Sequence, residues 1–140
     1  GFRHELKMRA ESLGVQDRVI FLGHRNDIRE ILSASDISLS LTEKPEAFGR
    51  VIVESLSLGT PVVAYNHGGA AEQLEVMLPS GRVPVGDLKR AAEAVASFLE
   101  TPPTIATEHP FTLDQMQRST LGVYEELLSQ TRVQEPSGLT

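Results

Sequence analysis

The 140-residue sequence contains no cysteine and no tryptophan, and aromatic residues make up only 5% of it. Without cysteine the protein can form neither disulfides nor thiolate metal sites. Its apolar runs fall far short of the roughly 20 residues that a membrane-spanning helix needs. The residues after Gly1 do not resemble a signal peptide either. These absences make a cytoplasmic protein the default expectation.

Positive charge is also scarce, because the sequence has 13 Lys and Arg residues but 19 Asp and Glu residues, which gives a formal net charge of −6. A broad nucleic-acid-binding face needs clustered Lys and Arg, so we expect no nucleic-acid partner. A single small anion can still bind, since a helix N-terminus offers backbone amides. The 40% of hydrophobic residues and the length of 140 suit one globular domain.

Hydrophobic spacing and turn residues predict strands that alternate with helices. Strands are expected at 18–23, 36–41 and 61–65. Helices are expected at 2–13, 26–35, 48–58, from about 70, at 88–99 and at 112–130, with Asn26 and Asp87 as N-terminal caps. Such an alternation predicts an α/β fold, a Rossmann-like parallel sheet with helices on both faces.

Other segments carry no clear periodicity. Residues 76–86 are interpreted as irregular, and the Pro- and Thr-rich stretch 101–110 as a linker. We expect residues 1–130 to form one domain and residues 131–140 a flexible tail. Because a helix comes first, with no strand before it to feed the sheet, we also expect the chain to be a fragment of a longer protein.

One stretch, EAFGRVIVESLSLGTPVV at residues 46–63, places two carboxylates eight positions apart. On the simplest interpretation, Glu54 is a solvated partner of Arg50 at i−4, a pair worth only ~0.2–0.5 kcal/mol. Glu46 would then be an acid favoured before a helix start by the helix dipole.

Taken together, the two acids suggest a ligand site. The turn at Phe48 and Gly49 leaves free amides, and Gly49 has no side chain to block close approach. If Glu46 lies at the mouth of the helix, Glu54 lies about 12 Å along its axis, at ~1.5 Å of rise per residue. A nucleoside diphosphate sugar is long enough to reach both, and carboxylates pair well with neighbouring hydroxyls.

The motif EAFGRVIVE, followed by SLSLGTPVVAYNHGGAAE, resembles the E-x7-E and Gly-Gly-x-x-Glu region of the retaining glycosyltransferases of family four. Those enzymes have the two-domain GT-B fold. The segments RVIFLGHRNDIREILSASDISLSLT and GDLKRAAEAVASFL resemble the adjoining parts of the same family, so the similarity covers about residues 3–100. It implies the C-terminal, donor-binding domain, with a nucleotide sugar as substrate and with neither a metal nor another cofactor.

The resemblance assigns roles residue by residue. Glu46 would lie beside the donor sugar and its reacting centre, as the catalytic acid of the motif, and Glu54 would bind the ribose hydroxyls. Amides of Ala47, Phe48 and Gly49 would meet the sugar, and those near Gly49 and Arg50 the diphosphate, where fixed dipoles stabilise the charge of the leaving group. The loop from 23 to 27 would lie near the base, through Gly23, His24 and Asn26.

The family also has parts that this chain does not contain. Its basic clamp for the diphosphate and its N-terminal acceptor domain would both precede Gly1, so these 140 residues alone are not expected to catalyse transfer. Many members act at the inner membrane surface, which makes peripheral membrane contact through a full-length protein a further expectation. Arg50 is open to two interpretations, a phosphate contact or a solvated pair with Glu54.

Two other functions stay open at this point. One is a nucleotide-sugar epimerase of the same fold, and the other is a nucleotide-sugar-binding domain without catalysis. A phospho-receiver domain fits less well, because its acceptor Asp should close a strand whereas Asp36 opens one. His67 and Glu72 are lesser ligand candidates, and Gly68-Gly69 lacks the G-x-G-x-x-G pattern of a dinucleotide site.

Overall fold

The computed structural model describes residues 1–132, with side chains through Ser129. Its centre is a three-stranded parallel sheet with the strand order β1-β2-β3. The strands are β1 (Ser38–Ser40), β2 (Val62–Tyr65) and β3 (Arg82–Val83). The helices are α1 (Phe2–Ser12), α2 (Ile28–Ser33), α3 (Arg50–Ser57), α4 (Gly68–Met77), α5 (Leu88–Glu100) and α6 (Leu113–Arg132), with short 3-10 turns η1 (Gln16–Arg18) and η2 (Pro79–Gly81).

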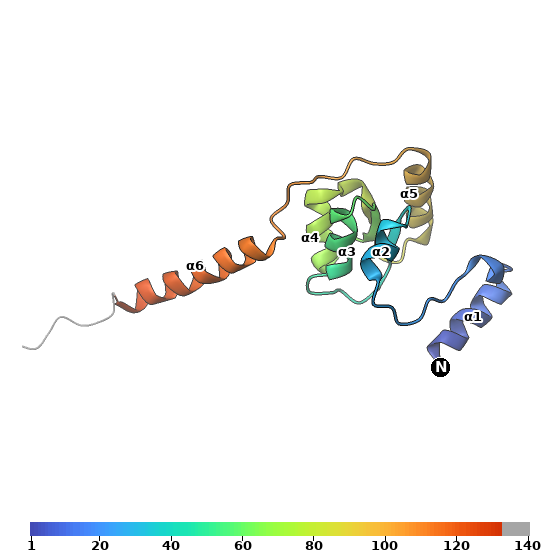
Figure 1. Cartoon of the computed structure of the whole chain (residues 1–140), viewed down its shortest axis with the longest axis horizontal. Coiled ribbons are helices and arrows are strands. Elements are labelled where there is room, and N and C mark those ends of the chain that lie inside the picture. Colours follow the sequence, from blue (N-terminus) through green and yellow to red (C-terminus); the bar gives the residue numbers. More distant parts are fainter. Residues whose placement is uncertain (133–140) are drawn as a thin grey trace, which may run out of the picture.

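The sheet lies between two helical layers. α3 and α4 pack on each other and on one face of the sheet, and α5 packs against β2 and β3 from the other face (Figure 1). All four residues of β2 are buried, as expected for a central parallel strand covered on both sides. The predicted α/β class, with a parallel sheet and helices on both faces, is therefore confirmed.

The core helices form for reasons that are visible in the sequence. In α3, Ile52, Ser55 and Leu56 are buried, which is the i, i+3, i+4 spacing of one helix face. Asp87 caps α5 as predicted, because its carboxylate accepts a hydrogen bond from the backbone N–H of Arg90 at 2.9 Å. Most residues of the buried core cluster lie in β2, β3, α3, α4 and α5.

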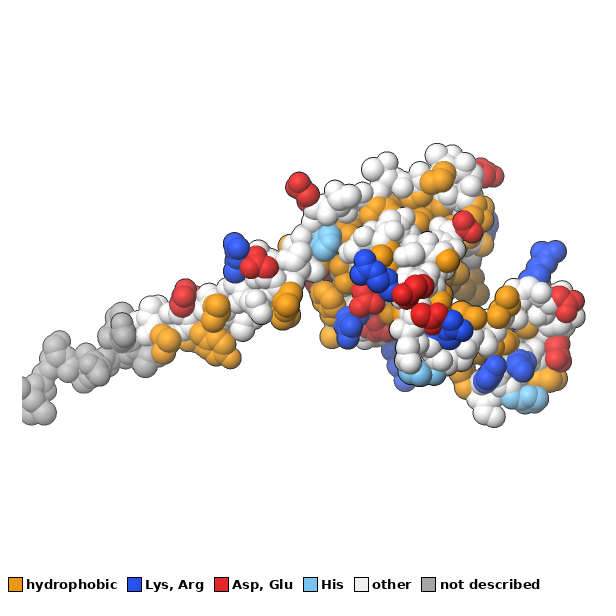
Figure 2. Space-filling model, in the orientation of Figure 1, with side chains coloured by type: hydrophobic (Ala, Val, Ile, Leu, Met, Phe, Trp, Pro, Cys, Tyr) orange, Lys and Arg blue, Asp and Glu red, His pale blue; other side chains and the backbone are white. Residues whose placement is uncertain are grey.

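The first and last helices lie outside this core. α1 and α6 project from the central body at opposite ends (Figure 1). The side chains of 113–129 are all exposed, and apolar ones gather along one side of α6 (Figure 2). In α1 only Ala10 is buried. Within the described residues, no helix is both long and apolar enough to cross a membrane.

The strand predicted at 18–23 does not form. Arg18 ends the turn η1, and residues 19–23 lie in no strand, with Ile20 82% exposed. A strand is stabilised only where a neighbour completes its hydrogen bonds, and among the described residues no strand runs beside this segment. The spacing of apolar residues in this segment is typical of a strand. Whether a strand forms also depends on a neighbouring strand, which the local sequence does not determine.

Two other segments differ from prediction. The stretch 76–86 is not irregular throughout, because it holds the end of α4, η2 and the short edge strand β3. The stretch 101–110 has no regular structure, as expected of a linker, yet it is packed on the body. The N–H of Ala106 donates to the carbonyl of Met77 at 2.9 Å, and Ile105 packs against the core. Of the predicted tail, residues 131 and 132 are helical and the rest lies outside the described residues.

Candidate functional site

The loop that joins β1 to α3 carries the first acid of the motif. Glu46, Ala47 and Phe48 are exposed, and the helix begins at Arg50 rather than at residue 48. Gly49 is the N-cap and has φ of +70°, a left-handed conformation that favours glycine. Glu46 therefore lies in a loop four residues before the helix, and the expected 12 Å separation along one helix axis does not apply.

Glu46 lies at the carboxyl ends of the first two strands, where ligands of open parallel sheets are expected. It borders a small cavity of about 10 Å³, roughly the space of one water. The cavity is lined by Ser40, Thr42, Glu46, Ile52, Tyr65, His67 and Ala70. The ring Nε2 of His67 makes a 2.9 Å hydrogen bond with the carbonyl of Thr42, which joins the ends of the two strands.

The N-terminus of α4 holds this loop closely. The N–H of Gly69 donates to the carbonyl of Glu46 at 2.9 Å. A Cβ on Gly69 would lie 2.6 Å from the Cα and the O of Phe48, and one on Gly68 would lie 2.6 Å from the O of Glu46. The Gly-Gly pair thus lets two backbones meet, a packing role that involves no dinucleotide.

One further contact was not anticipated from the sequence. The side-chain amide of Gln73 donates to the carbonyl of Phe48, and Gln73 is 1% exposed. The sequence feature that could have indicated this contact is the position of Gln73, next to Leu74 and four residues before Met77, on the buried face of α4. A polar residue on such a face needs a hydrogen-bond partner, and here the partner is the loop.

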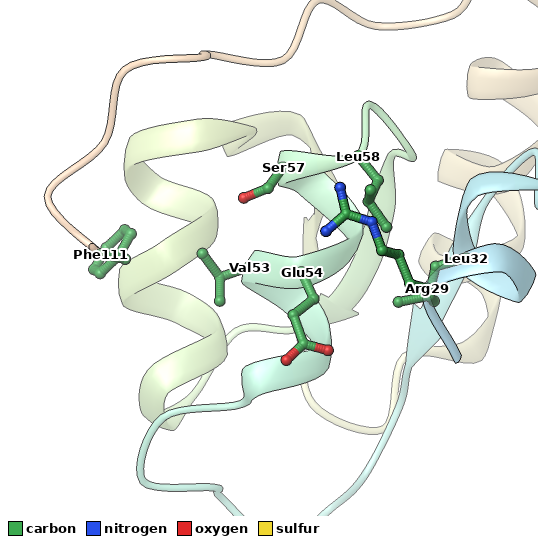
Figure 3. Close-up of a pocket in the computed structure, with 7 residues that line it drawn as sticks. All are labelled: Arg29, Leu32, Val53, Glu54, Ser57, Leu58 and Phe111. Atoms are coloured by element: carbon green, nitrogen blue, oxygen red, sulfur yellow. The ribbon is translucent and has the colours of Figure 1, made fainter. Parts of the chain in front are cut away.

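Glu54 lines a separate hollow on the other side of α3. The cavity has a volume of about 430 Å³ and is lined by Arg29, Leu32, Val53, Glu54, Ser57, Leu58 and Phe111. Figure 3 shows Arg29 reaching from α2 toward α3, with Glu54 on α3 and Phe111 on the opposite side. The Glu54 side chain is 44% exposed and lies 3.3 Å from Arg50, the solvated pair of the simplest interpretation. Glu54 therefore forms an exposed ion pair with Arg50 and also lines this cavity.

The third predicted element of the site, the loop from 23 to 27, stands apart. Gly23, His24 and Asn26 are exposed, and no hydrogen bond within residues 1–132 joins them to residues 46–54. Asn26 does not cap α2, because Asp27 occupies the N-cap position and makes no side-chain capping bond. The carboxylate of Asp27 binds Arg25 instead.

This ion pair is the only feature of the described residues with a clear effect on ionisation. The hydrogen bond from Arg25 lowers the pKa of Asp27 from its ordinary value of 3.8. The same bond raises the pKa of Arg25. No three His, Asp or Glu side chains in the described part of the chain lie close enough together to hold a metal ion.

The family follows from comparison with known proteins. The sequence profile described as "Glycosyl transferases group 1" matches residues 1–110. The chain belongs to the group 1 glycosyltransferases. This confirms the glycosyltransferase superfamily that the motif at residues 46–54 suggested, while the assignment to family four and the retaining mechanism stay predictions.

Comparison of this group 1 glycosyltransferase chain with individual proteins supports the same family. It is 30% identical to the lipopolysaccharide core biosynthesis mannosyltransferase LpsB of Rhizobium meliloti over 91% of this chain and 39% of that protein. It is 29% identical to the N-acetyl-alpha-D-glucosaminyl L-malate synthase of Bacillus anthracis over 89% of this chain and 31% of that protein. The chain thus spans well under half the length of these relatives.

Solved structures give the same fold. Anabaena Alr3699/HepE in complex with UDP and glucose aligns with a TM-score of 0.67 and 36% identity, over 71% of this chain and 27% of that one. A glycosyltransferase from Rickettsia africae ESF-5 aligns with a TM-score of 0.76 and 27% identity, over 91% of this chain and 36% of that one. The group 1 glycosyltransferase chain therefore has the α/β architecture of part of those two proteins.

Proposed function

We propose that this group 1 glycosyltransferase chain binds the nucleoside diphosphate sugar donor of a retaining glycosyl transfer. The supporting observation is the position of Glu46, at the carboxyl ends of β1 and β2 and just before the first turn of α3. A ligand placed there meets a carboxylate and a helix N-terminus together, which suits a sugar joined to a diphosphate.

The proposed roles follow the loop and the helix. Glu46 lies beside the sugar and its reacting centre, and Ala47, Phe48 and Gly49 offer backbone amides to its hydroxyls. Amides at Gly49 and Arg50 face the diphosphate. In the reaction the bond between the anomeric carbon and the phosphate oxygen breaks and one to the acceptor oxygen forms. Fixed amide dipoles stabilise the charge that develops on the leaving diphosphate.

In the proposed arrangement the nucleoside occupies the cavity beside Glu54. A volume of about 430 Å³ lies within the usual range for small-molecule sites. The two oxygens of the Glu54 carboxylate accept from the paired ribose hydroxyls, after its solvated pair with Arg50 has opened. The loop carrying Gly23, His24 and Asn26 approaches the base from the start of α2.

Transfer itself is proposed for a longer protein. The relatives are more than twice the length matched here, which leaves room for a second domain that holds the acceptor. We propose that this protein acts in the cytoplasm, with peripheral membrane contact made outside this chain. The donor serves as substrate, and no further cofactor is invoked.

Calorimetry with UDP-, GDP- and ADP-sugars tests the donor site. Because hydrogen bonds to a charged group contribute ~1.5–3 kcal/mol, Glu54→Ala should weaken the best ligand at least about tenfold. Glu93→Ala is the matched control, since Glu93 forms the same kind of exposed i, i+4 pair with Lys89 on α5. Binding of no donor by the wild type, or equal binding by Glu54→Ala, would contradict the proposal.

Product analysis tests the transfer step in the longer protein. NMR of the product should show the sugar on an acceptor hydroxyl with its anomeric configuration kept. A free nucleotide sugar with one inverted ring carbon would indicate an epimerase instead. Glu46→Gln should abolish the product, whereas unchanged product would leave only a binding role for this chain.

A further inference from the structure

Two carbonyls of the β1–α3 loop are turned toward α4. The carbonyl of Glu46 accepts from the N–H of Gly69 at 2.9 Å, and the carbonyl of Phe48 accepts from the side chain of Gln73. Gln73 and Gly69 are both buried, so bulk water does not compete for these bonds. α4 thus sets the direction of alternate peptide groups in an otherwise exposed loop.

The direction of each carbonyl determines that of the next amide. In a trans peptide the C=O and the following N–H point in opposite directions, and none of the described peptide bonds is cis. With the Glu46 and Phe48 carbonyls facing α4, the N–H groups of Ala47 and Gly49 face away from it. Neither amide donates to an acceptor within residues 1–132. The loop therefore holds two unused donors beside the first turn of α3, one in the exposed Ala47 and one in the buried Gly49.

We propose that Gln73 is a positioning residue that holds the peptide between Phe48 and Gly49 so that the Gly49 amide, beside that of Ala47, faces the donor. The identity of the ligand, a nucleoside diphosphate sugar, rests on the proposed function. The geometry of the loop does not depend on that identity. The sugar hydroxyls and the diphosphate supply the acceptors that these amides lack. Fixing the amides before the ligand arrives removes an ordering cost from binding.

A purely structural role accounts poorly for a glutamine at this position. The side-chain oxygen Oε1 of Gln73 is buried and has no hydrogen-bond partner among the described residues. A buried polar atom without a partner destabilises the fold, so an apolar side chain would serve the packing between α3 and α4 better. The bond to Phe48 is what the glutamine provides and an apolar residue cannot.

Proteolysis of the free protein measures how firmly the loop is held. Gln73→Met keeps the length of the side chain and removes its donor, so chymotrypsin should cut after the exposed Phe48 about tenfold faster. Ser55→Ala is the matched control, because Ser55 is buried in α3 and its hydroxyl bonds to nothing in the described structure. The control should stay within about twofold of the wild type. An unchanged rate for a folded Gln73→Met would overturn the proposal.

Ligand titration followed by NMR separates positioning from binding in general. Gln73→Met should weaken UDP-glucose about tenfold and leave uridine unchanged, since uridine has neither diphosphate nor sugar for the amides to meet. Glu54→Ala should weaken both ligands. If Gln73→Met binds UDP-glucose as the wild type does, the positioning role is wrong while the proposed donor site stands.

Hydrogen exchange of the wild type decides the matter even if Gln73→Met does not fold. The Gly69 amide should exchange slowly, because it is bonded to Glu46, and the Ala47 and Gly49 amides, which have no acceptor, should exchange faster. Exchange at Gly49 as slow as at Gly69 would overturn the inferred direction of the peptide. This measurement needs no ligand, so its result stands even if none of the UDP-, GDP- and ADP-sugars binds, an outcome that counts against the proposed function alone.

Discussion

The two loops assigned to the donor site are held in different ways. The loop at 42–49 is fixed from outside itself, by backbone and side-chain bonds from Gly69 and Gln73 and by the ring of Phe111, which lies edge-on to Phe48 with the centroids 6.2 Å apart. In the described part of the chain, the side-chain hydrogen bonds of the loop at 23–27 are confined to its own Arg25–Asp27 pair, in which both side chains are exposed.

This difference bears on what each loop can do before a ligand arrives. Contacts made by buried residues such as Gly69 and Gln73 persist when solvent and salt change, whereas an exposed ion pair is weak and screened. The loop at 42–49 can therefore present its amides in one arrangement. The loop at 23–27 can change shape at small cost, which suits the recognition of a base at the edge of the site.

The largest effect is expected where α4 and the loop are closest. In Gly69→Ala the new Cβ would lie 2.6 Å from the backbone of Phe48, so the loop must move away or the helix must shift. Overpacking of this kind costs ~1–3 kcal/mol, and urea denaturation should show that loss of unfolding free energy.

Gly122→Ala is the matched control, because nothing lies within 4 Å of its Cβ position in α6. Alanine is also the better helix former, so this variant should be as stable as the wild type or slightly more stable. Equal stability of Gly69→Ala and Gly122→Ala would show that the loop is not held tightly by α4.

A smaller effect is expected at the aromatic contact. Phe111→Leu keeps an apolar side chain and removes the ring edge that faces Phe48, and such aromatic pairs are worth ~0.5–1.5 kcal/mol. We expect a loss of unfolding free energy in that range and faster chymotrypsin cleavage after Phe48. Leu113→Ala, at a side chain that is 66% exposed, should change neither. A Phe111→Leu protein with unchanged cleavage would mean that α4 alone holds the loop.

The same contrast explains what the sequence could predict. α3 and α5 were predicted well, because the spacing of Ile52 and Leu56 and the cap at Asp87 are local features. The roles of Glu46 in binding and catalysis stay predictions, as do those of Glu54.

What could not be predicted depends on distant parts of the chain. The strand at 18–23 was wrong because pairing needs a neighbour that this segment does not have among the described residues. The bond from Gln73 to Phe48 joins residues 25 positions apart, and no spacing rule reports it. The packing of 101–110 was missed for the same reason, since a Pro-rich composition indicates irregular backbone but not what that backbone contacts.

The smallest effect is expected at the loop from 23 to 27. The pKa of Asp27 is lowered in the folded state by Arg25, so the pair contributes stability above the ordinary value of 3.8 and loses it as the pH falls through the lower, folded-state value. Arg25→Gln should therefore raise the titration midpoint of Asp27, measured by NMR of its carboxyl carbon.

The global stability of Arg25→Gln at neutral pH should stay within error of the wild type, because both partners of the lost pair are exposed. Lys89→Gln is the control, since it breaks a similar exposed pair on α5 and should leave the Asp27 midpoint unchanged. Chymotrypsin cleavage after Phe48 should not change in either variant. Faster cleavage in Arg25→Gln would show that the two loops are coupled, and the contrast between them would then fail.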